Sequence, residues 1–202
     1  MNKKIGVMGG SFDPIHTAHL LIAESAREQL ELDEIWFMPN ANPPHKQEQE
    51  VTDASLRCEM VEYAIADNPY FTLCRYEAER SEISYTADTL AFFHEKYPNT
   101  DWYFLMGGDS IRDFSTWYHP ERIAALAVLV IANREELQNE LLQEAVQRVK
   151  KEYHARVRIL SFPELDVSSS MIREKVRMGK SIRYLLPKQA EEYIMEHGLY
   201  RA

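Results

Sequence analysis

Two histidines three residues apart, His16 and His19, follow the run Gly9-Gly10-Ser11-Phe12-Asp13-Pro14-Ile15. Consecutive glycines allow a backbone to approach a ligand closely, and two imidazoles at this spacing share one face of a helix's first turn. That turn also has backbone N–H groups without partners inside the helix, and these attract anions. The pattern therefore predicts a phosphate site.

A second candidate anion site is the run Ser168-Ser169-Ser170-Met171-Ile172-Arg173. The chain carries a net charge of −9, which argues against a nucleic-acid or anionic-membrane surface and requires a local reversal of the field wherever an anion binds. Such a reversal occurs between Val167 and Tyr184, where five basic residues face the single acid Glu174. Serines ahead of a helix with an arginine predict a capped helix start that binds an anion. The alternative is that Arg173 pairs with a neighbouring acid.

Further polar residues follow other strand-like segments: Asn40 and the His45-Lys46 pair, Gly107-Gly108-Asp109, and Arg134. Ligands of open parallel sheets bind beyond the carboxyl ends of the strands, so these residues are candidates for the same ligand. Gly9, Gly10, Gly107 and Gly108 are four of only seven glycines in the chain, which favours a functional role over turn formation. Neither the dinucleotide motif G-x-G-x-x-G nor the complete P-loop pattern G-x-x-x-x-G-K-[ST] occurs, since the tripeptide Gly179-Lys180-Ser181 has Glu174 where the pattern needs its first glycine.

The chemistry that these residues suit is phosphoryl or nucleotidyl transfer by positioning and charge stabilisation, because no covalent nucleophile is evident. Cys58 and Cys74 lack the spacing of a zinc site, and no structural metal is expected. With no apolar leader and no apolar stretch of membrane-spanning length, a cytoplasmic protein is expected.

The elements that must position these residues alternate between strands and helices. Strands are expected at Lys4–Met8, Glu34–Met38, Phe71–Cys74, Trp102–Met106, Val128–Ala132 and Val157–Leu160. Helices are expected at Leu20–Leu30, Leu56–Ala66, Ala87–Tyr97, Arg122–Leu126, Glu136–Tyr153, Met171–Met178 and Lys188–His197. This alternation predicts an α/β fold, a mostly parallel sheet with helices on both faces. We expect one domain over residues 1–202, with an α/β core at 1–160 and a small helical part at 161–202.

At these residues the chain resembles a known superfamily. Gly10-Ser11-Phe12-Asp13-Pro14-Ile15-His16-Thr17-Ala18-His19 resembles the G-S-F-D-P-x-H-x-G-H motif of the nucleotidylyltransferases, and Ser168–Arg173 resembles their I-S-S-T-x-I-R motif. Within that superfamily, the chain most resembles the bacterial nicotinate-nucleotide adenylyltransferases. Four further segments carry this resemblance: Pro39–Lys46, Ser84–Leu90, Gly107-Gly108-Asp109 with Trp117, and His197–Tyr200. Two departures are Ala18 for the usual Gly, which adds a Cβ at a helix start expected to pack against ATP, and Ser170 for Thr, which keeps the hydroxyl.

The resemblance implies a Rossmann-like doubly wound fold and a definite reaction. In that reaction the 5′-phosphate of nicotinate mononucleotide attacks the α-phosphate of ATP in line, and deamido-NAD and pyrophosphate form without a covalent enzyme intermediate. Mg²⁺ bridging the phosphates of ATP is expected to stabilise part of the charge. A homodimer is possible by the same resemblance.

The site residues are implied by the resemblance as well. The residues implied for ATP are Gly9, Gly10, Ser11, Phe12, His16, His19, Gly107, Asp109, Arg134, Ser169, Ser170 and Arg173. Those implied for nicotinate mononucleotide are Lys46, Tyr85, Thr86, Trp117 and Tyr118. The catalytic roles fall to His16, His19, Lys46 and Arg173.

Other interpretations stay open from the residues alone. Lys46 can be a solvated loop lysine, Asp109 a helix cap, Trp117 a core residue, Asp13 a turn residue, and Arg134 the partner of Glu135 or Glu136. A relative that transfers AMP or CMP to phosphopantetheine or glycerol phosphate is a second enzyme hypothesis, which Trp117 and the Pro43–Lys46 run argue against. A catalytically silent nucleotide sensor is a third hypothesis. The polar segment 40–53 is a candidate mobile loop over the site.

Overall fold

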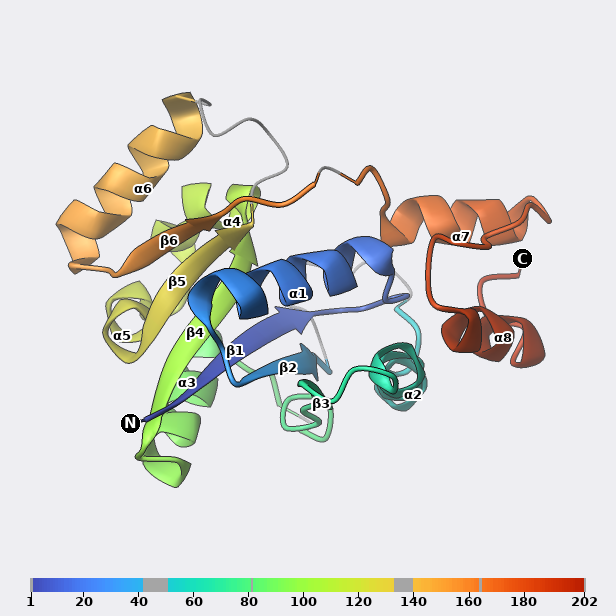
Figure 1. Ribbon diagram of the computed structural model, residues 1–202, viewed down its shortest axis with the longest axis horizontal. Coiled ribbons are helices and arrows are strands. Elements are labelled where there is room, and N and C mark those ends of the chain that lie inside the picture. The colour runs from blue at the N-terminus through green and yellow to red at the C-terminus, as the bar shows by residue number, and fades with distance from the viewer. Residues whose placement is uncertain (1, 42–50, 81, 133–139, 164, 202) are drawn as a thin grey trace. The chain divides into compact units, whose positions relative to one another are not determined.

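A six-stranded sheet forms the framework of the protein, in the order β3-β2-β1-β4-β5-β6 (Figure 1). The computed structural model describes residues 2–41, 51–80, 82–132, 140–163 and 165–201. The strands are β1 (Lys3–Gly10), β2 (Glu34–Pro39), β3 (Phe71–Leu73), β4 (Thr100–Gly107), β5 (Ala127–Ala132) and β6 (Val157–Leu160). The pairs β1–β4, β4–β5 and β5–β6 are parallel. The Rossmann-like α/β fold is thereby confirmed.

Helices follow the strands in the expected alternation. They are α1 (Thr17–Leu30), α2 (Ala54–Ile65), α3 (Thr86–Lys96), α4 (Gly108–Arg112), α5 (Pro120–Leu126), α6 (Glu140–Tyr153), α7 (Ser169–Arg177) and α8 (Lys188–Glu196), with a 3₁₀ turn, η1, at Phe114–Thr116. The elements α4 and η1 were not predicted, because segments this short show no hydrophobic period. The first strand also continues through Gly9 to Gly10, two residues beyond its predicted end.

Two compact units interleave along the chain. The first comprises Met1–Met8, Glu24–Ile35 and Ser84–Glu164, and the second comprises Gly9–Ala23, Trp36–Ile83 and Leu165–Ala202. The C-terminal helices α7 and α8 belong to the same unit as Gly9–Ala23. The organisation as one domain stays a prediction.

The first unit is built around the most apolar strand, β5. All six residues of β5 are buried, as is usual for a strand inside a parallel sheet with both faces covered. Helix α3 contacts α5, and α6 contacts α4 and α5. The rings of Phe93 in α3 and Trp102 in β4 stack with their centroids 5.1 Å apart. These contacts give the ends of β4 and β5 a rigid support.

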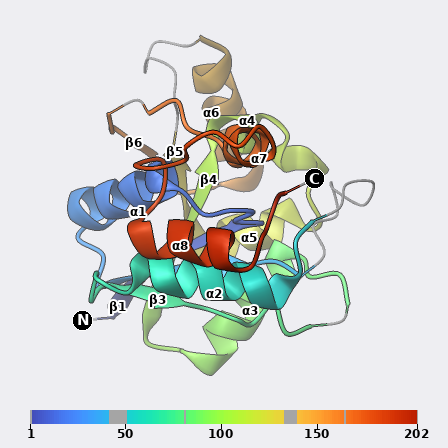
Figure 2. The same ribbon diagram turned by 90° about the vertical axis from the view of Figure 1, so that its right-hand side faces the viewer.

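The second unit contains the helix pair α2 and α8, which lie side by side (Figure 2). The Tyr193 hydroxyl of α8 donates to Glu59 of α2 at 2.9 Å. Burial and this carboxylate raise the pKa of Tyr193 to about 12. Asp53 caps α2, its carboxylate accepting from the backbone N–H of Ser55 at 2.7 Å. None of the helices in the described part of the chain has the length and apolar character needed to span a membrane.

Candidate functional site

The turn between β1 and α1 has a strained and buried residue at its centre. Phe12 is 2% exposed and adopts the left-handed conformation with φ 47°, which is uncommon for a bulky side chain. Its ring meets that of His19 edge-to-face, with 5.1 Å between centroids. A Cβ on Gly10 would lie 3.2 Å from the Phe12 ring, so a glycine there makes room for this packing.

The two histidines stand at the start of α1 in direct contact. Their rings stack with centroids 3.7 Å apart and planes 26° apart. The His16 carbonyl accepts from the backbone N–H of His19 at 2.9 Å, and the backbone N–H of His16 donates to Nδ1 of His19 at 3.2 Å. Because Nδ1 accepts, the proton of a neutral His19 ring resides on Nε2. His16 is 2% exposed and His19 is half-buried.

Ala18, in the same turn, departs from the superfamily motif. Its side chain is 3% exposed, so the added methyl group lies within the protein and offers little surface to a ligand.

The second motif begins helix α7, as the serines predicted. The Ser168 hydroxyl caps the helix by accepting from the backbone N–H of Met171 at 3.2 Å. The N-terminus of α7 is the positive end of the helix dipole, and Arg173, about one turn further along the helix, adds a positive charge close to it. This local field is the reversal that an acidic chain needs in order to bind an anion.

Two hydrogen bonds join the second motif to the first. The Ser169 hydroxyl donates to the Pro14 carbonyl at 2.8 Å. Arg173 donates to the Asp13 carbonyl at 2.6 Å and to the Ser170 hydroxyl at 3.2 Å. Arg173 therefore bridges the two motifs, whereas the alternative was a pairing with an acid on its own helix. The hydroxyl proton of Ser169 is already donated, so this side chain has only lone pairs to offer a ligand.

Two residues that sequence reasoning did not assign to the site hold the same turn. Arg57 is 1% exposed and donates to four backbone carbonyls, those of Ser11, Asn40, Ala41 and Thr52, at 2.6 to 3.2 Å. Burial lowers the pKa of Arg57, and the charge of Asp13 counteracts that effect. The Tyr200 hydroxyl donates to the Asp13 carboxylate at 2.6 Å. Tyr200 belongs to the His197–Tyr200 piece of the family resemblance, but Arg57 gave no sequence signal.

In the first unit, Gly107 and Asp109 lie where β4 passes into α4. A Cβ on Gly107 would meet nothing within 4 Å, and its φ of −74° suits any residue. Neither packing nor backbone conformation therefore requires glycine there. The Asp109 side chain is 96% exposed and pairs with Arg112 at 3.2 Å. Such an exposed pair contributes little to stability and leaves the carboxylate accessible.

Four residues implied for nicotinate mononucleotide also belong to the first unit. The rings of Tyr85 and Tyr118 lie 4.4 Å apart, and both residues are exposed. Trp117 is half-buried, with its ring centroid 6.0 Å from that of Phe104 and 5.8 Å from that of Phe114. Thr86 begins α3, whose first turn has no side-chain cap from Tyr85. Helix α3 thus begins beside an aromatic ring and without a side-chain cap, and further aromatic rings occur at Trp117 and Tyr118, between η1 and α5.

Lys46 and Arg134, which the resemblance implies for the site, lie outside the described residues, as does most of the expected loop at 40–53. Of that loop, residues 40, 41 and 51–53 are described, and Asn40, Ala41 and Thr52 are the ones that Arg57 contacts.

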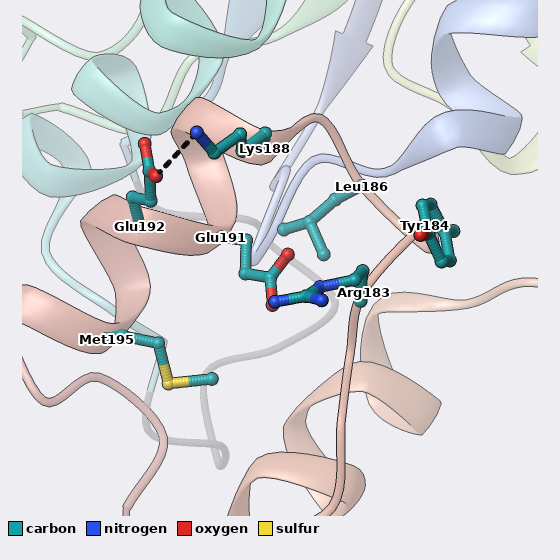
Figure 3. A pocket seen from close by; sticks show the side chains of 7 residues that line it. All are labelled: Arg183, Tyr184, Leu186, Lys188, Glu191, Glu192 and Met195. Atoms are coloured by element: carbon teal, nitrogen blue, oxygen red, sulfur yellow. Dashed lines mark ion pairs between the residues drawn. The ribbon is translucent and has the colours of Figure 1, made fainter.

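A pocket of about 480 Å³ in the second unit was not anticipated (Figure 3). Its lining comes from Arg183, Tyr184, Leu186, Lys188, Glu191, Glu192 and Met195. Lys188 and Glu192 pair at 3.2 Å, and the lining carries charges of both signs. The carbonyls of Tyr184 and Leu185 accept from the side chain and backbone of Thr17, the first residue of α1. The segment before α8 thus supports the start of α1.

The chain matches known proteins of one family over most of its length. A family model described as "Cytidylyltransferase-like" matches residues 7–175. A protein of Lachnoclostridium phytofermentans, named "Probable nicotinate-nucleotide adenylyltransferase", is 41% identical over 98% of this chain and 99% of its own. One of the same name from Bacillus cytotoxicus is 42% identical over 99% of this chain and 100% of its own.

Among solved structures, the Plasmodium falciparum nicotinic acid mononucleotide adenylyltransferase complexed with NaAD superposes with a TM-score of 0.79. It covers 98% of this chain and 97% of its own at 24% identity, a level that supports the fold. The family model, the full-length relatives and the fold all lead to the same conclusion. The chain belongs to the nicotinate-nucleotide adenylyltransferase family, a group of nucleotidyltransferase enzymes within the cytidylyltransferase-like proteins.

Proposed function

We propose that this enzyme transfers the AMP moiety of ATP to nicotinate mononucleotide, forming deamido-NAD and pyrophosphate in NAD biosynthesis. The observation that carries the proposal is the stacked His16–His19 pair, joined to the N-terminus of α7 by hydrogen bonds from Arg173 and Ser169. Relatives more than 40% identical along the whole chain carry the corresponding name.

The histidines bind the phosphates of ATP in this proposal. His19 accepts a backbone N–H at Nδ1, so its Nε2–H is the donor for the α-phosphate, where charge develops during transfer. His16 supports the His19 ring by stacking and binds the neighbouring phosphate. The backbone of Gly9, Gly10, Ser11 and Phe12 lines the approach to these donors.

Arg173 and the start of α7 hold the departing pyrophosphate. A helix N-terminus with a nearby guanidinium is a strong anion site. Ser170 contributes its hydroxyl, whereas Ser169 contributes its backbone N–H because its hydroxyl proton is donated to Pro14. The attack is in line and needs no enzyme nucleophile, so positioning and charge stabilisation supply the catalysis.

Mg²⁺ enters this proposal with ATP as the co-substrate. A hard cation prefers phosphate and water oxygens, and bound in this way it neutralises charge on the transferring group. Asp13 is a poor ligand for it, because its two carboxylate oxygens already accept from Tyr200 and from the backbone N–H of Thr52.

By the family resemblance, contacts to the nucleoside and to the acceptor fall to a further set of residues. Gly107, which no protein contact requires to be glycine, lets a ribose approach the backbone, and the exposed Asp109 carboxylate accepts from its hydroxyls. The half-buried Trp117 stacks on the pyridine ring beside Tyr85 and Tyr118. The uncapped N–H groups at Thr86 bind the nicotinate carboxylate. Lys46 and Arg134 are assigned to phosphates by the family resemblance.

The proposed reaction belongs in the cytoplasm, where ATP is made and consumed. A homodimer stays a prediction from the resemblance.

The test is pyrophosphate release with ATP, Mg²⁺ and nicotinate mononucleotide, with deamido-NAD identified as the second product. Wild-type protein is compared with His16→Ala, His19→Ala and, as a matched control, His94→Ala on the exposed side of α3. We expect turnover in the wild type and the control, and a loss of about a hundredfold or more in kcat for each site variant. Full turnover in His16→Ala or His19→Ala would contradict the proposed phosphate contact of that histidine. If the wild type forms no deamido-NAD, the proposed function is wrong.

A further inference from the structure

Phe12 holds a costly conformation in the centre of the proposed phosphate turn. A non-glycine residue keeps a positive φ only where several surrounding contacts hold it in that conformation, and such residues cluster at functional sites. The Phe12 ring contacts His19 and lies 5.9 Å from the ring of Phe37 in β2. A change in the Phe12 backbone would therefore move a packing partner of His19.

Arg57 fixes the residue before Phe12. One of its terminal nitrogens donates to the Ser11 carbonyl at 2.6 Å, while the rest of the guanidinium donates to Asn40, Ala41 and Thr52. All four acceptors are backbone carbonyls, and the planar fork of an arginine serves several of them at once, as a lysine cannot. The Ser11 peptide is thus held from inside the protein.

Tyr200 fixes the residue after Phe12. Its hydroxyl donates to Asp13 Oδ1 at 2.6 Å, and the backbone N–H of Thr52 donates to Oδ2 at 3.3 Å. Asp13 is 3% exposed, so these donors reach a carboxylate with little access to water. Burial, followed by the charge of Asp13, raises the pKa of Tyr200 well above its usual value, and the hydroxyl keeps its proton. Left-handed residues at Gly198 (φ 61°) and Tyr200 (φ 60°) turn the chain end into this position.

We propose that Tyr200 and Arg57 are positioning residues for adenylyl transfer: they hold Asp13 and Ser11 on either side of the strained Phe12, so that Phe12 keeps the two histidines in one geometry. The inference rests on the proposed function and assigns neither residue a contact with substrate. Its consequence is that the C-terminal turn of the chain controls the rate of a reaction that takes place at the first loop.

The experiment compares Tyr200→Phe with Tyr193→Phe. Each substitution removes one tyrosine hydroxyl that donates to a carboxylate, Asp13 for Tyr200 and Glu59 for Tyr193, and both tyrosines belong to the C-terminal part of the second unit. Tyr193→Phe is therefore a matched control for lost stability. Steady-state kinetics with ATP and nicotinate mononucleotide are recorded together with thermal unfolding of each variant.

We expect Tyr200→Phe to lower kcat about tenfold or more, the effect of one hydrogen bond to a charged group, with KM for both substrates within about twofold. Tyr193→Phe keeps the wild-type kcat. Equal kcat values for the two variants, or a decrease in each that follows its unfolded fraction, would overturn the inference. Failure of the wild type to form deamido-NAD would instead overturn the proposed function, so the two outcomes are distinguishable.

A second set of variants covers the case in which Tyr200→Phe unfolds. Asp13→Ala removes the acceptor of the Tyr200 hydroxyl, and the double variant Asp13→Ala with Tyr200→Phe completes a thermodynamic cycle. If Tyr200 acts through Asp13, the two effects on kcat are non-additive, and the tyrosine loses most of its effect once Asp13 is changed. Additive effects would contradict the inference. If Tyr200→Phe unfolds, kcat of Asp13→Ala alone decides: a loss of about tenfold at unchanged KM supports the inference, and a wild-type value contradicts it.

Discussion

The imidazole of His19 is fixed from two sides by His16, whose backbone N–H donates to Nδ1 of His19 at 3.2 Å and whose ring stacks on it at 3.7 Å. Nδ1 of His19 thereby accepts a hydrogen bond inside the protein, and in the neutral ring Nε2 carries the proton. A ring held in this way needs no reorganisation when charge develops on a phosphate, which is the condition for effective electrostatic stabilisation.

This relationship predicts different outcomes for two amide replacements of His19. The side-chain nitrogen of glutamine occupies a position close to Nε2, and that of asparagine a position close to Nδ1. We expect His19→Asn to lose about a hundredfold in kcat, because the donor to the phosphate is gone, and His19→Gln to lose distinctly less. The same pair of substitutions at the exposed His94 is the control. A more active asparagine variant would show that Nδ1, not Nε2, is the nitrogen that matters.

Arg173 bridges the Asp13 carbonyl and the Ser170 hydroxyl through two nitrogens, which a lysine cannot reproduce. Arg173→Lys keeps the charge and loses this geometry, so kcat should fall about tenfold or more. Arg177→Lys, one turn later in the same helix, changes an exposed residue paired with Glu174 and should leave kcat unchanged. Similar kinetics for the two variants would mean that charge alone suffices at the start of α7.

The cap of α2 by Asp53 predicts a pH-dependent stability. Hydrogen bonds from the Ser55 hydroxyl and backbone lower the pKa of Asp53 below its ordinary value of 3.8. The folded state therefore favours the charged form, so this contribution to stability is fully present above pH 3.8 and is lost as the pH falls through the lower folded value.

Asp53→Ala should therefore cost about 1 kcal/mol at neutral pH, or about 2–4 °C in Tm. The difference from the wild type should shrink in urea unfolding curves recorded below pH 3.8. Asp67→Ala is the control: it removes a carboxylate just beyond the C-cap Ala66, at the opposite end of α2 from the Asp53 cap. An equal loss in that control would show that net charge, not the cap, is responsible.

Trp117 is half-buried against Phe104 and Phe114, which leaves part of its ring accessible. If that part stacks on the pyridine ring, Trp117→Ala should raise KM for nicotinate mononucleotide about tenfold while KM for ATP stays within about twofold. Trp117→Phe should lie in between. Trp36→Phe, at another half-buried tryptophan, is the control for lost packing. A parallel rise in both KM values would indicate a core residue, the alternative that the sequence left open.

Much of the fold was predictable because its long elements have clear hydrophobic periods. The alternation predicted the parallel sheet and seven of the helices, and the serines predicted the capped start of α7. Anion binding at the residues near Gly9 and Ser168 stays a prediction. The short α4 and η1 could not be found in this way, since five and three residues hold too little of a period.

The network behind the phosphate turn was not predictable for a different reason. Arg57 contacts a carbonyl 46 residues away, and Tyr200 contacts a carboxylate 187 residues away. Nothing in the local sequence distinguishes a buried arginine on a helix from a solvated one, because the difference depends on what the fold brings around it. Ser169 shows the same limit: its place in a motif indicated an anion, but its hydroxyl bonds to Pro14.

The central claim is that this enzyme adenylylates nicotinate mononucleotide rather than another phosphate. The most direct test is a competition in one reaction, with limiting ATP, Mg²⁺ and equal concentrations of nicotinate mononucleotide, nicotinamide mononucleotide and 4′-phosphopantetheine. The product ratio reports the ratio of kcat/KM values. We predict that deamido-NAD predominates, because uncapped N–H groups at the start of α3 select the carboxylate. Predominance of dephospho-coenzyme A, or equal amounts of deamido-NAD and NAD, would contradict the account.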